Sequence, residues 1–467
     1  MNKISIGTLA QHVDTAVSVA GWVSVRRDHG KLIFIDLRDE TGTIQTVFSP
    51  RHEAALKTAE TLRGEWVISV QGLLKKRPEG MVNPDISNGD LELEATDITV
   101  LNQAETPPFD TQTDGKEIGE ESRMEYRYVD LRRSRLQRNI RARHDTIHFL
   151  RNHLSDQGFI EIETPILTKS TPEGARDYVV PSRVYRGKFY ALPQSPQQYK
   201  QLLITSGFEK YFQVARCFRD EDTRGDRQLE FTQLDIEMAF VTREDVMAVI
   251  EESLIALVQN VYPGKRIQDM PFPRLSYKEA MDTYGVDRPD LRTDKNDPNL
   301  LSFCWVVDFP FFEKTEADGW TFTHNPFSAP LPEHMEWLME KKRVGEILTT
   351  QYDIVLNGFE VGGGSIRNHH PEALEKVFEI MGFERERIYR NFGHMLKALS
   401  SGAPPHGGIA WGLDRLVSIL QNEPNIREVI AFPKTGEGRD FMMNAPSELE
   451  EKQLRELGLN IKKAIHN

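Results

Sequence analysis

The chain has 467 residues, with 58 lysines and arginines against 71 aspartates and glutamates, so its formal net charge is −13. Hydrophobic residues make up 39%, enough for a core in each of about two to four domains, which excludes a disordered or fibrous protein. Its two cysteines, Cys217 and Cys304, are too far apart in sequence for a CxxC pair or a four-ligand zinc site. No stretch approaches the roughly 18 apolar residues of a membrane span. We therefore expect a cytoplasmic protein.

Residues 1–103 are predicted to form a small β domain. A helical stretch is expected at His52–Leu62. Strands with one helix in about a hundred residues are typical of a five-stranded Greek-key OB barrel. The segments that alternate polar and apolar residues between turn residues are 18–28, 31–41, 43–50, 66–77 and 91–102.

The early strands of such a barrel commonly bind single-stranded nucleic acid, because aromatic side chains stack on bases and polar groups read base edges. The candidates for this face are Arg26, Arg27, Phe34 and Gln45. Spacing alone favours a core position for Phe34, so a core residue and a stacking platform both remain open.

A Pro-rich stretch without periodicity at 104–115 marks the first domain boundary. We assign 104–132 to a linker or hinge and 133–467 to one larger domain. The larger domain begins with the apolar spacing of a helix at 133–157 and then returns to strand chemistry at 158–165.

Arginines are concentrated between Arg123 and Arg143, where eight of them accompany only two carboxylates, a local charge of +6. Such a run indicates either a nucleic-acid patch or the solvated face of a helix.

The larger domain mixes helices and strands without regular βαβ alternation. It has no GxxxxGK[ST] sequence and no GxGxxG after a strand, which argues against a P-loop or Rossmann nucleotide site. Charged residues and glycines are concentrated in four places: 170–177 with 192–200, 212–237, 357–370 and 407–420.

Two of these segments predict a ligand cavity. In 357–370 three consecutive glycines permit a close approach of the backbone to a ligand. In 212–237 strand alternation predicts one polar face, which is costly to bury without partners and so indicates the wall of a cavity. This face carries Phe231, Gln233, Asp235 and Glu237.

These segments resemble the class II aminoacyl-tRNA synthetases, and among them the bacterial-type aspartyl branch, over nearly the whole chain. GFIEIETP (158–165) is similar to the dimer-interface motif, FRDED through FTQLDIE (218–237) to the motif that binds ATP and the acceptor end, and GIAWGLDRL (408–416) to the third class motif. The resemblance implies an α+β protein with an OB-fold anticodon-binding domain and a catalytic domain built on an antiparallel sheet flanked by helices. It also implies an enzyme that activates aspartate with ATP and transfers it to the 3′-hydroxyl of a tRNA.

The resemblance assigns the ATP chemistry to charged residues. Arg219 would neutralise the α-phosphate as charge develops on it, and Arg415 would bind the γ-phosphate end and stack on adenine opposite Phe231. Asp353 and Glu360 would bind Mg²⁺. The implied catalytic residues are Arg219, Glu221 and Arg415, and the implied ATP site adds Gln228, Phe231, Glu360, Gly412, Leu413 and Asp414.

For the amino acid, the resemblance implies that Arg367 forms a bidentate fork on the aspartate side chain while Lys200 adds a point charge. These cationic donors would reject the amide of asparagine. The other implied aspartate ligands are Glu173 on a mobile loop, Ser195, Gln197, Asp235 and His324.

Two departures from the aspartyl pattern stand out. The large inserted domain of bacterial-type enzymes is absent near 285–303, which affects peripheral contacts or stability and leaves the chemistry in place. Asn325 follows His324 where many relatives have a second histidine, so substrate sensing by that pair is expected to differ.

The expected macromolecular partners are a second copy, through the segment around Pro165, and tRNA. His29 and Gly80 resemble the branch that charges both tRNA(Asp) and tRNA(Asn), although both are also compatible with ordinary turns. The alternatives are a strictly tRNA(Asp)-specific enzyme, a non-charging paralogue that binds tRNA, and an ammonia-dependent asparagine synthetase, against which the barrel counts. The expected tRNA contacts are Arg26, His29, Phe34, Gln45, Gly80 and Arg224.

Overall fold

The computed structural model describes residues 3–84, 86, 88–170 and 174–462, and the chain divides into two compact units, 1–134 and 135–467. The residues predicted as a linker, 104–132, belong to the first unit. Among the described residues, no helix combines the length and the apolar character needed to cross a membrane.

The first unit contains a closed barrel of five strands in the order β1-β2-β3-β5-β4, as the sequence predicted. A short helix, α1 (Glu53–Ala59), lies between the third and fourth strands, inside the predicted helical stretch. Alternate side chains of every strand fill one apolar core, which includes Val19, Ile35 and Leu93. The strands are β1 (Ala16–His29), β2 (Leu32–Asp39), β3 (Gly42–Phe48), β4 (Val67–Lys76) and β5 (Leu91–Asn102).

Most arginines of the arginine-rich run are buried or half-buried, and only two of the eight are exposed. After the barrel, α2 (Glu120–Glu125) and α3 (Arg127–Asp130) bury Arg127 and Arg133 around the carboxylate of Asp130, which is 0% exposed. Further along, Arg143 pairs with Asp414. For these side chains, neither a nucleic-acid patch nor a solvated helix face is correct, because their charges are neutralised in internal ion pairs.

The second unit is built on an eight-stranded sheet in the order β12-β14-β17-β18-β19-β10-β9-β6. Neighbouring strands are antiparallel except at the two edges, where β12 runs parallel to β14 and β6 to β9. This confirms the predicted antiparallel sheet and adds its parallel edges. The strands are β6 (Ile160–Glu161), β9 (Lys210–Phe218), β10 (Glu230–Ala239), β12 (Arg274–Ser276), β14 (Phe303–Val307), β17 (Tyr352–Leu356), β18 (Phe359–Ile366) and β19 (His406–Gly412).

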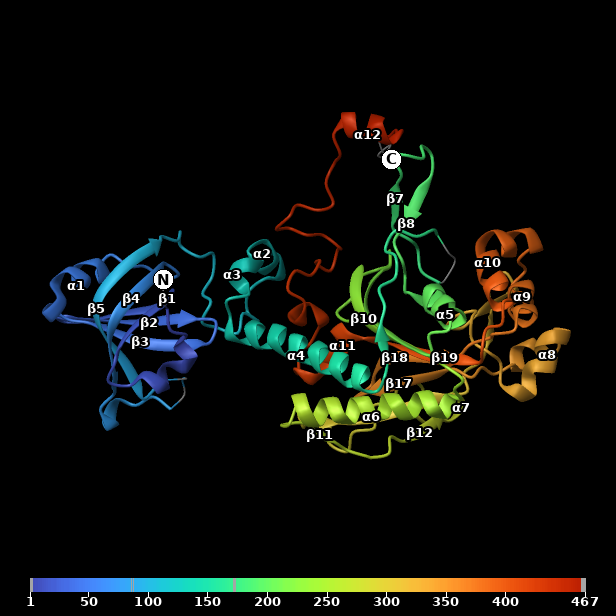
Figure 1. Ribbon diagram of the computed structural model, residues 1–467, viewed down its shortest axis with the longest axis horizontal. Helices are drawn as coiled ribbons and strands as arrows, with labels where there is room; N and C mark the ends of the chain where they lie inside the picture. The colour runs from blue at the N-terminus through green and yellow to red at the C-terminus, as the bar shows by residue number, and fades with distance from the viewer. Residues whose placement is uncertain (1–2, 85, 87, 171–173, 463–467) are drawn as a thin grey trace. The chain divides into compact units, whose positions relative to one another are not determined.

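Three helices cover one face of this sheet: α4 (Ser134–Asp156), α6 (Arg243–Val261) and α11 (Leu413–Leu420) (Figure 1). Leu150, Ile250 and Leu416 from these helices pack on Ile236 and Trp411 of the sheet, and all are buried. The helix α6 begins where Thr242 and Asp245 form a reciprocal capping box, which satisfies backbone donors of its first turn. The opposite face of the sheet is therefore left for polar residues.

The remaining helices and short strand pairs of the second unit lie outside the eight-stranded sheet. Residues 285–299 join the helix α7 (Tyr277–Tyr284) to the strand β13 (Leu300–Leu301), in the region where the sequence predicts a missing insert. The helices are α5 (Gln197–Thr205), α7 (Tyr277–Tyr284), α8 (Met335–Glu340), α9 (Pro371–Ile380), α10 (Arg385–Leu399) and α12 (Glu451–Leu457), and the two-stranded pairs are β7 (Val179–Pro181) with β8 (Phe189–Ala191), β11 (Arg266–Ile267) with β13 (Leu300–Leu301), and β15 (Phe312–Lys314) with β16 (Trp320–Phe322).

Candidate active site

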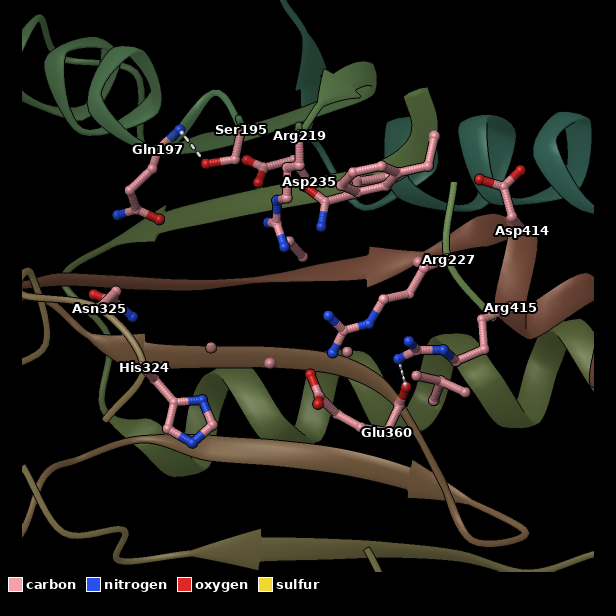
Figure 2. Close-up of a pocket in the computed structure, with 18 of the residues that line it drawn as sticks. Ser195, Gln197, Arg219, Arg227, Asp235, His324, Asn325, Glu360, Asp414 and Arg415 are labelled. Carbon is pink, nitrogen blue, oxygen red and sulfur yellow. Dashed lines mark hydrogen bonds between the residues drawn. The ribbon is translucent and has the colours of Figure 1, made fainter. Parts of the chain in front are cut away.

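A cavity of about 400 Å³ lies on the polar face of the sheet and brings together the four segments that the sequence singled out (Figure 2). Its floor consists of Phe231, Gln233 and Asp235 from β10 with the glycines of β18 and β19. This confirms three residues of the face predicted by strand alternation, whereas the fourth, Glu237, does not line the cavity. The predicted site residues that line it are Ser195, Gln197, Lys200, Arg219, Glu221, Gln228, Phe231, Asp235, His324, Glu360, Arg367, Gly412, Asp414 and Arg415.

The three glycines of β18 serve the sheet as well as the cavity. A Cβ on Gly364 would lie 2.1 Å from the carbonyl oxygen of Gly408, so the neighbouring strand excludes any side chain there. At Gly363, a Cβ would instead meet the Asp353 carboxylate at 2.8 Å. Close approach to a ligand, which the sequence predicted for the whole triplet, therefore applies to Gly363.

Four ionised side chains form a buried cluster at one end of the cavity, and none is more than 2% exposed: Lys200, Asp235, Glu237 and Arg367. The Nζ of Lys200 lies 3.0 Å from Asp235 Oδ2 and 3.1 Å from Glu237 Oε2. Burial raises the pKa of Asp235 to about 6 despite the nearby lysine. Burial also acts on Glu237, but Arg367 and Lys200 outweigh it and hold its pKa at about 2. The cluster balances two positive against two negative charges.

Arg367 is already committed on one edge of its guanidinium. Its Nε and Nη2 donate to the two carboxylate oxygens of Glu237 at 2.8 and 3.0 Å, and its Nη1 donates to Ser365 Oγ at 2.9 Å. The bidentate fork that the resemblance implied for the substrate is thus made with Glu237. Two of the five N–H groups, on Nη1 and Nη2, are left for a ligand.

Arginines cluster at the other end of the cavity. The guanidinium of Arg219 lies 5.1 Å from the ring centroid of Phe231, and its Nε is buried without a hydrogen-bond partner among the described residues. Arg415 donates through Nη1 to the Glu360 carbonyl and through Nη2 to Asp226, at 3.1 Å. Sequence reasoning missed Arg227, which Figure 2 shows directed toward Glu360 beside Arg415. Because Arg227 lies on a charged loop, strand periodicity could not single it out.

Several residues implied for the ATP site have internal partners. The side chain of Gln228 donates to the Lys434 carbonyl at 3.1 Å and accepts from its amide at 2.7 Å. Asp414 accepts from the Thr232 amide at 2.8 Å, and Leu413 is 0% exposed in the apolar core. These residues position the walls of the cavity through such contacts.

Two carboxylates flank the space above Gly363. Asp353, paired with Gly363 across the strands, accepts from Gln351 Nε2 at 3.1 Å, and a Cβ on Gly363 would lie 3.6 Å from Glu360 Oε1. Burial, followed by the charge of Glu360, raises the pKa of Asp353 well above its usual range. A divalent cation would relieve this repulsion, and paired carboxylate oxygens fit Mg²⁺.

The remaining described residues that were predicted for aspartate also line the cavity. Ser195 Oγ accepts from the Gln197 amide at 3.3 Å, and the ring of His324 packs edge-on against Phe309. Asn325 Oδ1 accepts from the Phe327 amide at 3.0 Å, so its side chain caps the local turn. Glu173 lies outside the described residues.

On the barrel, the outer face carries Phe34 and Gln45 as predicted. Phe34 is half-buried between Ile33 and Ile35, which are core residues, so the core interpretation of Phe34 is wrong. Its ring packs edge-on against His29, with centroids 5.5 Å apart.

The structure selects Arg27 over Arg26 for this face. Arg27 is paired with Phe34 across the strands, whereas Arg26 is paired with the buried Ile35 and donates to Asp28 at 2.9 Å. A bulge between Val23 and Val25 sets this alternation. A contact with tRNA is therefore less well supported for Arg26 than for Arg27.

Two further predicted tRNA contacts lie on exposed turns. Gly80 is in the 3₁₀ turn Glu79–Met81, where an added Cβ would meet no atom of the described residues within 4 Å. Arg224 is exposed on the loop that joins β9 and β10.

The comparisons with known proteins agree with this combination of barrel, sheet and cavity. Residues 119–436 match the family described as tRNA synthetases class II (D, K and N), and residues 17–101 match the OB-fold nucleic acid binding domain. The chain belongs to the class II tRNA synthetases of the D, K and N group.

Among its relatives, a protein of Rubrobacter xylanophilus named Aspartate--tRNA(Asp/Asn) ligase is 40% identical, covering 97% of this chain and 95% of the relative. An Aspartate--tRNA ligase of Staphylococcus saprophyticus is 41% identical, covering 96% of this chain and 97% of the relative. The Rubrobacter alignment spans 576 positions, 109 more than the 467 residues here, so the relative carries sequence that this chain lacks.

Among solved structures, asparaginyl-tRNA synthetase from Pyrococcus horikoshii, complexed with asparaginyl-adenylate, shares the fold. Its TM-score is 0.75 at 23% identity, covering 93% of this chain and 98% of that one.

Proposed function

We propose that this chain is an aspartate–tRNA ligase that activates L-aspartate with ATP and charges tRNA(Asp) and also tRNA(Asn). The observation that carries the proposal is the division of one cavity into two ends: a buried cluster with Lys200 and Arg367, and an arginine-lined end with Arg219, Arg227 and Arg415. An amino acid with an acidic side chain fits the first end and a triphosphate fits the second.

In the first step the aspartate α-carboxylate attacks the α-phosphorus of ATP, which forms aspartyl-adenylate and releases pyrophosphate. The substrate carboxylate is itself the nucleophile, so orientation and charge stabilisation supply most of the acceleration. Arg219 neutralises the charge that develops on the α-phosphate, and Phe231 beneath it offers an aromatic face for adenine. Arg415 and Arg227 neutralise the outer phosphates.

Mg²⁺ bound at Asp353 and Glu360 would supply a Lewis acid that offsets phosphate charge. Without it, the two carboxylates would repel the triphosphate. The chain provides room for the ion, because Gly363 has no side chain to fill the space between the two carboxylates.

Selection of aspartate follows from the charge balance of the cluster. The two remaining N–H groups of Arg367 and the nearby Lys200 face the substrate side chain as donors only. The amide nitrogen of asparagine would place a donor against these donors, which leaves buried polar groups unpaired. Oδ1 of Asp235 has no hydrogen-bond partner among the described residues and is available for the substrate ammonium.

In the second step the 3′-hydroxyl of the terminal tRNA adenosine attacks the adenylate carbonyl. We assign anticodon reading to the outer barrel face, where Phe34 stacks and Gln45 reads a base edge. Charging of tRNA(Asn) is supported by the open turn at Gly80, which places no side chain against a base, and by His29 beside Phe34. One of the named relatives is called an Aspartate--tRNA(Asp/Asn) ligase and the other an Aspartate--tRNA ligase.

We also propose a cytoplasmic homodimer. Ile160, Ile166 and Leu167 around Pro165 are 51%, 47% and 53% exposed, which is unusual for three neighbouring aliphatic side chains and supports a self-complementary interface. Both cysteines are free, as expected in a reducing compartment. Light scattering at micromolar concentration should give the mass of a dimer, and a stable monomer would contradict the proposed homodimer.

Aspartate-dependent exchange of labelled pyrophosphate into ATP tests the first step. We expect exchange with aspartate and background with asparagine or lysine. No exchange, with tRNA binding retained, would favour the non-charging paralogue, and transfer to ammonia would favour an asparagine synthetase.

A further inference from the structure

A chain of hydrogen-bonded side chains lies on the outer face of the barrel. It links Asp36 on β2, Arg27 on β1 and Gln45 on β3, beside the ring of Phe34. The chain lies outside the apolar core, and the side chains of Arg27 and Asp36 are 40% and 16% exposed.

The first link fixes the arginine. Arg27 Nη1 donates to Asp36 Oδ2 at 2.7 Å and Nη2 donates to Asp36 Oδ1 at 2.8 Å, a bidentate pair of nearly ideal length. The pKa of Arg27 is raised through this hydrogen bond. The planar guanidinium is therefore held in one orientation on the sheet.

The second link fixes the glutamine. Arg27 Nη2 also lies 3.4 Å from Gln45 Oε1. Because a guanidinium only donates hydrogen bonds, the atom of the Gln45 amide that faces it must be the oxygen. The amide nitrogen then points away, and it makes no hydrogen bond within the described part of the chain.

We propose that Asp36 is a positioning residue for tRNA selection, which acts through Arg27 to fix the Gln45 amide so that it offers N–H donors to an anticodon base. The base it selects presents a keto group, uracil O4 or guanine O6, at the place where cytosine or adenine presents an amino group. The inference rests on the proposed function, since it assumes that this barrel face reads RNA.

The experiment measures aspartylation kcat/KM with the full-length enzyme and tRNA(Asp) transcripts, in which each anticodon base in turn is exchanged between its keto and amino forms, U for C and G for A. The wild type is expected to lose about 10- to 100-fold at the position read by Gln45, as for one well-formed base contact. In Asp36→Ala and in Gln45→Ala, the penalty at that same position should shrink to less than about threefold.

Glu94→Gln is the matched control, because it removes an ion pair with Lys75 elsewhere on the same barrel. It should keep the position-specific penalty. Unchanged aspartate-dependent pyrophosphate exchange shows that each variant is folded in its catalytic unit.

The possible results distinguish a failure of the positioning role of Asp36 from a failure of the proposed function. If Gln45→Ala removes the penalty and Asp36→Ala retains it, the positioning role is wrong while anticodon reading stands. If neither variant changes any penalty, this face does not read the anticodon, and both the positioning role and the assignment of anticodon reading to this face are wrong. Absence of pyrophosphate exchange in the wild type would instead reject the ligase.

Discussion

Replacing Glu237 by glutamine perturbs the amino-acid end of the cavity with almost no change in shape. Glu237 is 0% exposed and accepts from Arg367 Nε at 2.8 Å, Arg367 Nη2 at 3.0 Å and Lys200 Nζ at 3.1 Å. The glutamine amide keeps one acceptor oxygen but turns an NH₂ group toward these donors. The charge of the four-residue cluster changes from zero to +1.

Removing one partner of a buried ion pair costs about 3–5 kcal/mol, so we expect the free energy of unfolding to fall by about that amount. Arg367 also loses the carboxylate that orients it toward the substrate. At about 1.5–3 kcal/mol for hydrogen bonds to a charged group, this corresponds to a rise of about 10- to 150-fold in the aspartate KM.

Pyrophosphate exchange with aspartate and ATP varied separately, together with urea unfolding, measures both effects. The control is Glu428→Gln, because Glu428 accepts from Arg135 Nη2 at 2.8 Å in a buried pair outside the cavity. We expect the control to lose stability and keep its aspartate KM. An unchanged aspartate KM in Glu237→Gln, or an equal rise in the ATP KM, would refute the orienting role.

Because burial raises the pKa of Asp235 to about 6, the aspartate KM should rise as pH falls from 7 to 5, and a flat profile would exclude its pairing with the ammonium. The same raised pKa means that the folded state binds this proton more tightly than the unfolded chain, so this contribution to stability declines as pH rises from about 4 to 6. Gly363→Ala, whose Cβ would lie 2.8 Å from Asp353 Oδ1, should raise the Mg²⁺ concentration for half-maximal exchange, and an unchanged value would remove the metal from this position. Phe34→Ala should raise the tRNA KM about tenfold and spare exchange, consistent with about 1–3 kcal/mol for stacking one base, whereas equal loss of both would indicate a structural role.

Local alternation made part of the site predictable. The polar face of β10 follows from a period of two over a regular strand, so Gln233 and Asp235 could be placed in a cavity from the sequence. The same rule fails on β1, because a bulge after Val23 shifts which residues face outward. For that reason the sequence could not separate Arg26 from Arg27.

Long-range partners made the rest unpredictable. The carboxylates that neutralise Arg135 and Arg143 are Glu423, Glu428 and Asp414, each more than 270 residues further along the chain. Charge counting over a short window therefore suggested an exposed basic patch where the fold has buried ion pairs. The ion pair between Arg367 and Glu237 likewise depends on the sheet order, because β19 lies between β18, which precedes Arg367, and β10, which carries Glu237.

Charging of a tRNA(Asp) transcript, with aspartate, asparagine and lysine offered separately, is the direct test of the proposed ligase activity. We expect aspartyl-tRNA(Asp) as the only product, formed with ATP consumption, and a kcat/KM for tRNA(Asn) comparable to that for tRNA(Asp). A ratio of several hundredfold in favour of tRNA(Asp) would contradict the dual specificity. Charging with asparagine or lysine, or no aspartyl-tRNA at all, would contradict the assignment of the enzyme itself.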